Sequence, residues 1–193
     1  MGALGARLAI ALLWLVHWLP LRVQWAIGSA LGAMLHALAG SRRRIAARNL
    51  ELCLPELGAP ERAALLRDHF RWLGRSLVER GLLWFAPRDK LKSLIQVEGD
   101  IGLAERTEGA VMWLVPHFLA LEIAGLTMLI CQGRRGCDIY QRQSNAVFDA
   151  AITRGRHRFG DSALISRKDG VKPLIRAVRD KSAESPKIGR AHV

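Results

Sequence analysis

The feature that most constrains the fold is an apolar run followed at once by a helical stretch. Residues 110–115 form a continuous apolar segment of strand length, rich in β-forming side chains. Residues 118–130 contain no proline and only one glycine, so they predict a helix. Pro116 ends the strand, which leaves His117 in the turn between the two elements. The sequence therefore predicts a buried strand, a turn that carries a histidine, and a helix.

His117 and Glu122 lie on either side of this turn, with four residues between them. Five steps along an ideal helix turn through about 500°, so the two side chains would not share a face if both were helical. They can pair only if His117 lies outside the helix and Glu122 in its first turn, where the helix dipole favours a neutral imidazole. The spacing predicts a base and the acid that orients it. The alternative is that His117 is an ordinary loop histidine and Glu122 a solvated carboxylate on the helix surface, with no shared function.

Length and charge narrow the possible classes of protein. A chain of 193 residues has room for one domain of ordinary size and an appendage, and its 50% apolar content excludes global disorder. The net charge of +12 indicates a polyanionic partner, which can be nucleic acid, anionic lipid or an acidic protein. The cysteines, Cys53, Cys131 and Cys137, have no metal-ligand spacing and indicate a reducing compartment.

The N-terminal residues 1–41 are predicted to be a membrane anchor. Residues 8–21 and 23–41 carry no formal charge, and the apolar pattern continues beyond any point where a signal peptide would be cleaved. One spanning helix and two interfacial helices both fit, and a buried pair of core helices stays open as an alternative. The side chains that suit an interfacial aromatic belt are Trp14, Trp18 and Trp25. Those that suit the anionic cytoplasmic surface of the membrane are Arg42, Arg43, Arg44 and Arg48.

The remaining chain predicts helices first and then an α/β layer. A short helix over residues 45–59 ends in a Pro/Gly break, and a long amphipathic helix follows to about residue 85, with His69 and Arg71 interpreted as surface residues. Strands are predicted at 94–99, 110–115, 137–142 and 163–165, and further helices at 145–159 and 170–179. This alternation predicts an α/β fold with a largely parallel sheet, and His117 would lie at its carboxyl edge.

Residues 134–181 are rich in lysine and arginine. The basic residues are most concentrated at Arg154, Arg156, His157 and Arg158, late in a predicted helix. The preference of cations for a helix C-terminus accounts for one or two of them. Guanidinium groups bind phosphate bidentately, so the whole set favours a phosphorylated or otherwise anionic substrate.

These residues together resemble a known family, the late acyltransferases of lipid A biosynthesis, which are lauroyl/myristoyl transferases of Gram-negative bacteria. This family lies within the lysophospholipid acyltransferase-like superfamily. The resemblance is carried by residues 44–57, the HX4E motif of His117 and Glu122, residues 145–149 with 155–158, and residues 167–169. It implies an N-terminal hydrophobic helical anchor followed by a three-layer α/β glycerolipid-acyltransferase fold, with neither cofactor nor metal.

The resemblance implies that His117 and Glu122 are the catalytic pair. It also points to Asn145, Asp149, Arg156 and Arg158 as positions of the family's downstream motif. The family commonly has Tyr-Arg before that motif, whereas here Gln141 follows the tyrosine and Arg142 comes next. The predicted substrate-binding residues are Arg142, Asn145, Asp149, Arg154, Arg156 and Arg158.

The activity that the resemblance implies is acyl transfer at the cytoplasmic face of the bacterial inner membrane. The acyl-carrier protein would be the donor and a hydroxyl of the Kdo-linked tetraacyl lipid A precursor the acceptor, with no nucleic acid involved. A related enzyme acylating lysophospholipid or another glycolipid is one alternative. A non-catalytic, membrane-tethered basic binding protein is another, and it would show salt-dependent affinity without turnover.

The C-terminal end departs from the family pattern. The acyltransferase domain is predicted over residues 42–187 and is expected to be truncated, since family members continue through another strand and an acidic segment. Residues 188–193 are expected to be a non-native tail. They can be encoded by ATC GGA AGA GCA CAC GTC, which matches a common sequencing-adapter string, and such segments do not belong to the fold.

Overall fold

The computed structural model describes residues 2–100, 102–131, 136–160 and 162–183. These residues divide into two compact units. The helical unit comprises Leu8–Ala86 with His117–Ala120, and the α/β unit comprises the other described residues, within 2–7, 87–116 and 121–183. The predicted tail at 188–193 lies outside the described residues.

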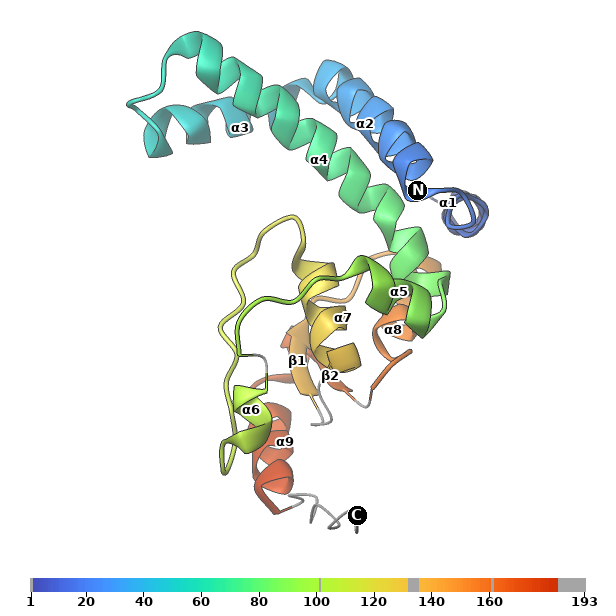
Figure 1. Cartoon of the computed structure of the whole chain (residues 1–193), viewed down its shortest axis with the longest axis vertical. Helices are drawn as coiled ribbons and strands as arrows, with labels where there is room; N and C mark the ends of the chain where they lie inside the picture. The colour runs from blue at the N-terminus through green and yellow to red at the C-terminus, as the bar shows by residue number, and fades with distance from the viewer. Residues whose placement is uncertain (1, 101, 132–135, 161, 184–193) are drawn as a thin grey trace. The chain divides into compact units, whose positions relative to one another are not determined.

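Helices α1 to α4 supply the helical unit (Figure 1). They are α1 (Ala3–Val16), whose first turn belongs to the other unit, α2 (Leu21–Leu38), α3 (Gly40–Cys53) and α4 (Ala59–Phe85). Helix α4 begins with a capping interaction in which the Gly58 N–H donates to the Glu61 carboxylate at 2.7 Å, and it ends before Pro87. The predicted long helix is therefore confirmed.

Glycines allow α2 and α4 to pack very closely. A Cβ atom added at Gly28 would lie 2.5 Å from the Cα atom of Arg75, and one added at Gly32 would clash with the carbonyl oxygen of Phe70. The face of α2 that meets α4 is therefore built from small residues and the fully buried Gln24. The Gln24 amide donates to the carbonyl oxygen of Leu19 at 2.8 Å, which fixes the turn between α1 and α2.

The opposite face of α2 is apolar and exposed. This arrangement reverses the usual pattern of a soluble protein, in which the apolar stripe of a helix faces the core. The exposed apolar side chains on α2 are Val23, Ile27, Met34 and Leu38. Those along the later turns of α1 are Leu8, Leu12 and Leu15. Among the described residues, no helix combines the length and the apolar character needed to cross a membrane.

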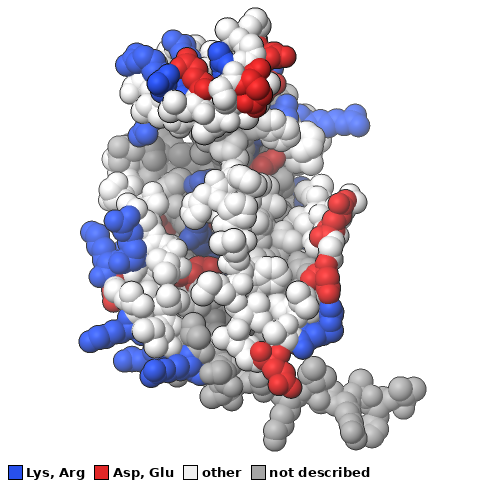
Figure 2. Space-filling view, turned by 90° about the vertical axis from the view of Figure 1, so that its left-hand side faces the viewer, with Lys and Arg blue, Asp and Glu red and all other residues white. Residues whose placement is uncertain are grey.

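Helix α3 carries a different, charged surface. Arg44 and Arg48 are exposed on it, and the Arg48 guanidinium pairs with the Glu51 carboxylate at 2.9 Å. Figure 2 shows basic and acidic side chains together at the top of the view, where α3 and the start of α4 lie. The surface of α3 therefore carries both signs of charge.

The α/β unit is built around two parallel strands. Strands β1 (Gly136–Tyr140) and β2 (Ser162–Ser166) pair in register from Gly136 with Ser162 to Tyr140 with Ser166, and α8 (Ala146–Arg156) connects them. This is a βαβ unit, so the predicted parallel pairing is confirmed. The other elements are α5 (Arg88–Leu94), α6 (Leu103–Arg106), α7 (Leu121–Cys131), a 3₁₀ turn (Arg167–Asp169) and α9 (Lys172–Ala183).

Two predicted strands are wrong. Residues 110–118 have no regular structure, and the side chains of Met112 and Leu114 are 95% exposed. At 94–99, α5 continues to Leu94 and irregular chain follows. An apolar run becomes a strand only when neighbouring strands satisfy its backbone groups. In the described part of the chain the sheet has only β1 and β2, so neither run is paired. The three-layer arrangement implied by the resemblance stays a prediction.

Candidate functional site

His117 lies in irregular chain before α7, and Glu122 lies in the first turn of that helix. Helix α7 begins at Leu121, later than the predicted start at residue 118, and the His117 side chain is exposed. A regular helix through both residues would have pointed them apart. The observed helix start therefore leaves only Glu122 in α7, and the pairing of His117 with Glu122 stays a prediction.

Glu122 is held by Arg156, which lies in the last turn of α8. The Arg156 Nε donates to Glu122 Oε2 at 3.2 Å, and Nη2 donates to Oε1 at 2.5 Å. The Arg156 side chain is only 29% exposed and the Glu122 side chain only 27%. This bidentate arrangement fixes the plane as well as the position of the carboxylate. Each carboxylate oxygen keeps a second lone pair that can accept another hydrogen bond.

The surroundings of Arg156 favour its charged form. Burial, the largest single effect, lowers the pKa of Arg156, but the hydrogen bond and the charge of Glu122 raise it, with smaller contributions from Asp138 and Tyr140 on β1. The net direction is upward. Arg156 therefore stays a permanent cation beside Glu122.

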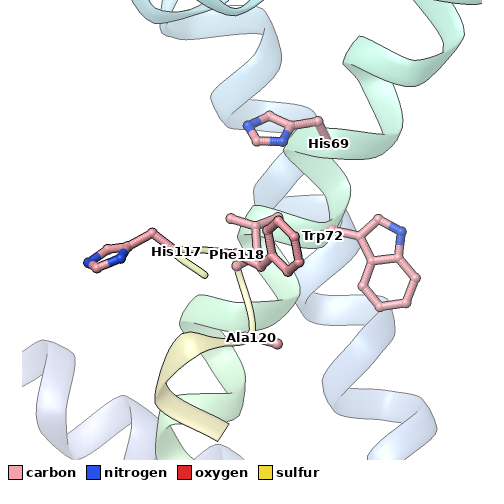
Figure 3. A pocket seen from close by; sticks show the side chains of 6 residues that line it. His69, Trp72, His117, Phe118 and Ala120 are labelled. Carbon is pink, nitrogen blue, oxygen red and sulfur yellow. The ribbon is translucent and has the colours of Figure 1, made fainter. Parts of the chain in front are cut away.

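A pocket adjoins His117 in the helical unit (Figure 3). It has a volume of about 540 Å³, within the range of small-molecule sites. Figure 3 shows the His117 imidazole pointing away from the side of the pocket that Trp72 forms. The lining residues are His69 and Trp72 from α4, and His117, Phe118, Leu119 and Ala120 from the segment before α7.

The other predicted substrate-binding residues have varied surroundings. The Asn145 side chain caps α8 by accepting hydrogen bonds from the N–H groups of Val147 and Phe148, both at 3.1 Å. The Asp149 carboxylate accepts a hydrogen bond from the backbone N–H of Gln143 at 2.8 Å. These contacts order the loop between β1 and α8.

Arg142 and Arg154 are exposed, whereas Arg158 is partly buried. The Arg158 guanidinium stacks over the Phe159 ring at 4.5 Å, and burial lowers its pKa. Of the predicted residues, the structure joins only Glu122 and Arg156 by a described ion pair. Substrate binding by the rest stays a prediction. Among the described residues, no group of three or more His, Cys, Asp or Glu side chains could hold a metal ion.

The pocket wall was missed from the sequence. The sequence predicts His69 as a surface residue and gives no indication that Trp72 belongs to a site. Both are exposed, but both also line the pocket. They are three positions apart on α4 and so share one face of the helix, which is the signal that the sequence contained. Residues 117–120, which line the pocket with them, have no regular secondary structure. No repeating pattern in the sequence therefore indicates that they lie beside this face of α4.

Comparison with known proteins shows which family the sequence resembles. A family model described as "Bacterial lipid A biosynthesis acyltransferase" matches residues 3–183. The chain is 35% identical over 162 residues to the lipid A biosynthesis palmitoleoyltransferase of Escherichia coli K12, covering 83% of this chain and 52% of that protein. It is 31% identical to the lauroyltransferase of the same organism, covering 89% of this chain and 56% of that protein.

The myristoyltransferase of Escherichia coli K12 is 32% identical over 177 residues, covering 91% of this chain and 54% of that protein. The chain thus spans about half the length of these curated relatives. No solved structure matches it. The match over residues 3–183 includes the turn of His117 and the Glu122–Arg156 pair, and the chain belongs to the bacterial lipid A biosynthesis acyltransferase family.

Proposed function

We propose that this protein transfers a fatty acyl group from the thioester of an acyl-carrier protein to a hydroxyl of a lipid A precursor. The family match supports the reaction class and the acceptor. The observation that carries the mechanism is the helix start at Leu121, which leaves His117 outside α7 and places Glu122 in its first turn. His117 also lines a pocket of a size that small molecules occupy.

In this mechanism His117 is the general base. Its neutral imidazole takes the proton of the acceptor hydroxyl while the hydroxyl oxygen attacks the thioester carbonyl carbon. The new C–O bond forms, the C–S bond breaks, and the leaving thiolate takes the proton back from the imidazolium. No covalent acyl-enzyme is needed, and general-base assistance of this kind is worth roughly 10²–10⁴-fold. Positioning of the two substrates must supply much of the remaining acceleration.

Glu122 orients the base, and Arg156 orients Glu122. A carboxylate that accepts the N–H of one imidazole nitrogen leaves the other nitrogen free to act as the base. The two hydrogen bonds from Arg156 hold the carboxylate in one plane, so its free lone pairs point in fixed directions. In this arrangement Arg156 is a positioning residue.

The location that fits this function is the cytoplasmic face of the inner membrane. The apolar side chains of α1 and α2 face outward, whereas small residues and Gln24 face inward. Membrane proteins show this inverted pattern, because lipid covers the apolar face and small residues let helices approach each other. Helices with an exposed apolar stripe can also lie in the interface without crossing it.

A comparison of acceptors tests the proposal. The protein is supplied with one acyl-carrier-protein thioester and, in separate reactions, with the tetraacyl lipid A precursor, a lysophospholipid or an unrelated glycolipid, and products are identified by mass spectrometry. We expect the acyl chain on the lipid A precursor. Transfer to lysophospholipid with none to the lipid A precursor would overturn the proposed acceptor.

A further inference from the structure

The pocket beside His117 has the chemistry of a site for hydrocarbon. Its surface is mostly apolar, and the residues that line it include Trp72, Phe118 and Leu119. Burying one CH₂ group of a ligand on such a surface is worth about 0.8 kcal/mol. The site therefore favours a long apolar chain over a sugar or a phosphate group.

The Trp72 ring is held in place from outside the pocket. The Arg75 guanidinium stacks over it at 4.6 Å and lies 5.7 Å from the Trp25 ring on α2. Arg75 is itself fixed, because its Nε donates to the Ser29 hydroxyl at 2.8 Å. These contacts restrain the Trp72 ring, although 52% of the residue's surface is exposed to solvent. A rigid wall of this kind costs less entropy on binding than a mobile side chain.

The position of His117 defines the orientation of a bound chain. His117 contributes to the lining, and its imidazole points away from the side that Trp72 forms (Figure 3). A base at this place takes the proton of a hydroxyl that attacks a carbonyl carbon at the edge of the pocket. The hydrocarbon attached to that carbonyl then extends over Phe118 and Leu119 toward Trp72.

We propose that this pocket binds the fatty acyl chain of the donor and that Trp72 is a specificity-determining residue for its length. The proposal rests on the proposed function, because it takes the carbonyl beside His117 to be that of the donor thioester. Removing the indole opens space at the wall, so longer chains gain room while shorter chains lose contacts.

Photo-cross-linking tests the binding site without requiring turnover. The probe is a fatty acyl pantetheine thioester with a diazirine in the middle of its chain, and labelled peptides are mapped by mass spectrometry. We expect label on residues 72–75 and 117–120. Excess unlabelled acyl pantetheine should abolish this label, whereas a phospholipid with the same acyl chains should not. Label confined to the exposed faces of α1 and α2, or removed by phospholipid as readily as by the thioester, would overturn the proposal.

Two tryptophan substitutions provide the matched comparison. Trp72→Ala should lower labelling of 117–120 on the order of tenfold, the factor that a good apolar contact supplies. Trp18→Ala removes another exposed indole, one that lies outside the pocket, and should leave this labelling unchanged. Trp72→Phe, which keeps an aromatic wall, should restore most of it. Equal labelling in all three variants would contradict the role of Trp72.

Chain-length selection separates this inference from the proposed function. With a series of donors, Trp72→Ala should shift the preferred length, measured as relative kcat/KM, toward longer chains. An unchanged preference in an enzyme that still acylates the lipid A precursor would overturn the inference and leave the proposed function intact. Transfer to another acceptor with pocket labelling preserved would overturn the proposed acceptor alone.

Discussion

At the scale of single residues, Arg156 decides how Glu122 can act. The sequence predicts that Arg156 binds the anionic substrate, whereas in the structure its Nε and Nη2 donate to the Glu122 carboxylate. The two roles differ in kinetics. Loss of a substrate contact raises KM, and loss of an orienting contact that matters in the transition state lowers kcat.

Arg156→Lys tests the orienting role. An ammonium cannot make the two parallel hydrogen bonds of a guanidinium, so one charge-assisted hydrogen bond is lost. Such bonds are worth about 1.5–3 kcal/mol, and we expect kcat to fall by roughly 10- to 100-fold with little change in KM. Arg67→Lys, at an exposed position on α4, is the control. A rise in KM with unchanged kcat would assign Arg156 to the substrate instead.

Asn145 offers a second test at this scale. Its side chain accepts two hydrogen bonds at the start of α8, and replacing such a cap with alanine costs about 1 kcal/mol. Asn145→Ala should therefore lower the free energy of unfolding in urea by that amount. Asn145→Ser, which also caps helices, should recover most of the loss. A variant of full stability with a raised KM would indicate the substrate-binding role that the family motif implies.

At the scale of elements, the contact between α2 and α4 depends on glycine. A Cβ at Gly32 would clash with the Phe70 carbonyl oxygen, whereas nothing lies within 4 Å of a Cβ at Gly125 in α7. Gly125→Ala should stabilise the protein by up to about 1 kcal/mol through helix propensity. Gly32→Ala should destabilise it by about 1–3 kcal/mol, since helix backbones must move apart. Equal urea midpoints for the two variants would contradict the close packing.

The sequence correctly predicts those elements whose ends and faces are marked by nearby residues. Helix α4 has a proline in its first turn, apolar residues at helical spacing and Pro87 beyond its end, and α8 has Asn145 as its cap. Strands β1 and β2 were predicted within a few residues of their observed ends. Residues 110–115 have the composition of a strand, but a strand also needs a partner, and that depends on distant parts of the chain.

The candidate site, like the fold, was predictable only where its residues lie close together in the sequence. The placement of His117 before a helix and of Glu122 inside it follows from Pro116 and local pattern. The pairing of Glu122 with Arg156 joins two helices 34 residues apart, and the contribution of α4 to the pocket joins segments more distant still. No spacing rule connects such segments, because the tertiary fold brings them together.

At the scale of the whole molecule, the outward apolar faces of α1 and α2 predict binding to a lipid surface. Leu12 is exposed in the middle of α1, and burying a leucine side chain is worth about 1.5–3 kcal/mol. Leu12→Glu should therefore reduce co-sedimentation with anionic phospholipid vesicles by on the order of tenfold or more. Leu65→Glu, an equally drastic change at an exposed position on α4, should leave it unchanged. Equal loss in both variants would contradict a binding face on α1.

The central claim is that His117 is the base for acyl transfer, and loss of function on its removal tests this most directly. The complete coding sequence that contains residues 1–183 is expressed in a strain that lacks the secondary acylation of lipid A, and the lipid A is analysed by mass spectrometry. We expect the native sequence and His36→Ala, at a histidine of α2 outside the pocket lining, to restore the secondary acyl chain, and His117→Ala to restore none. A secondary acyl chain added by His117→Ala at the native level would contradict the account.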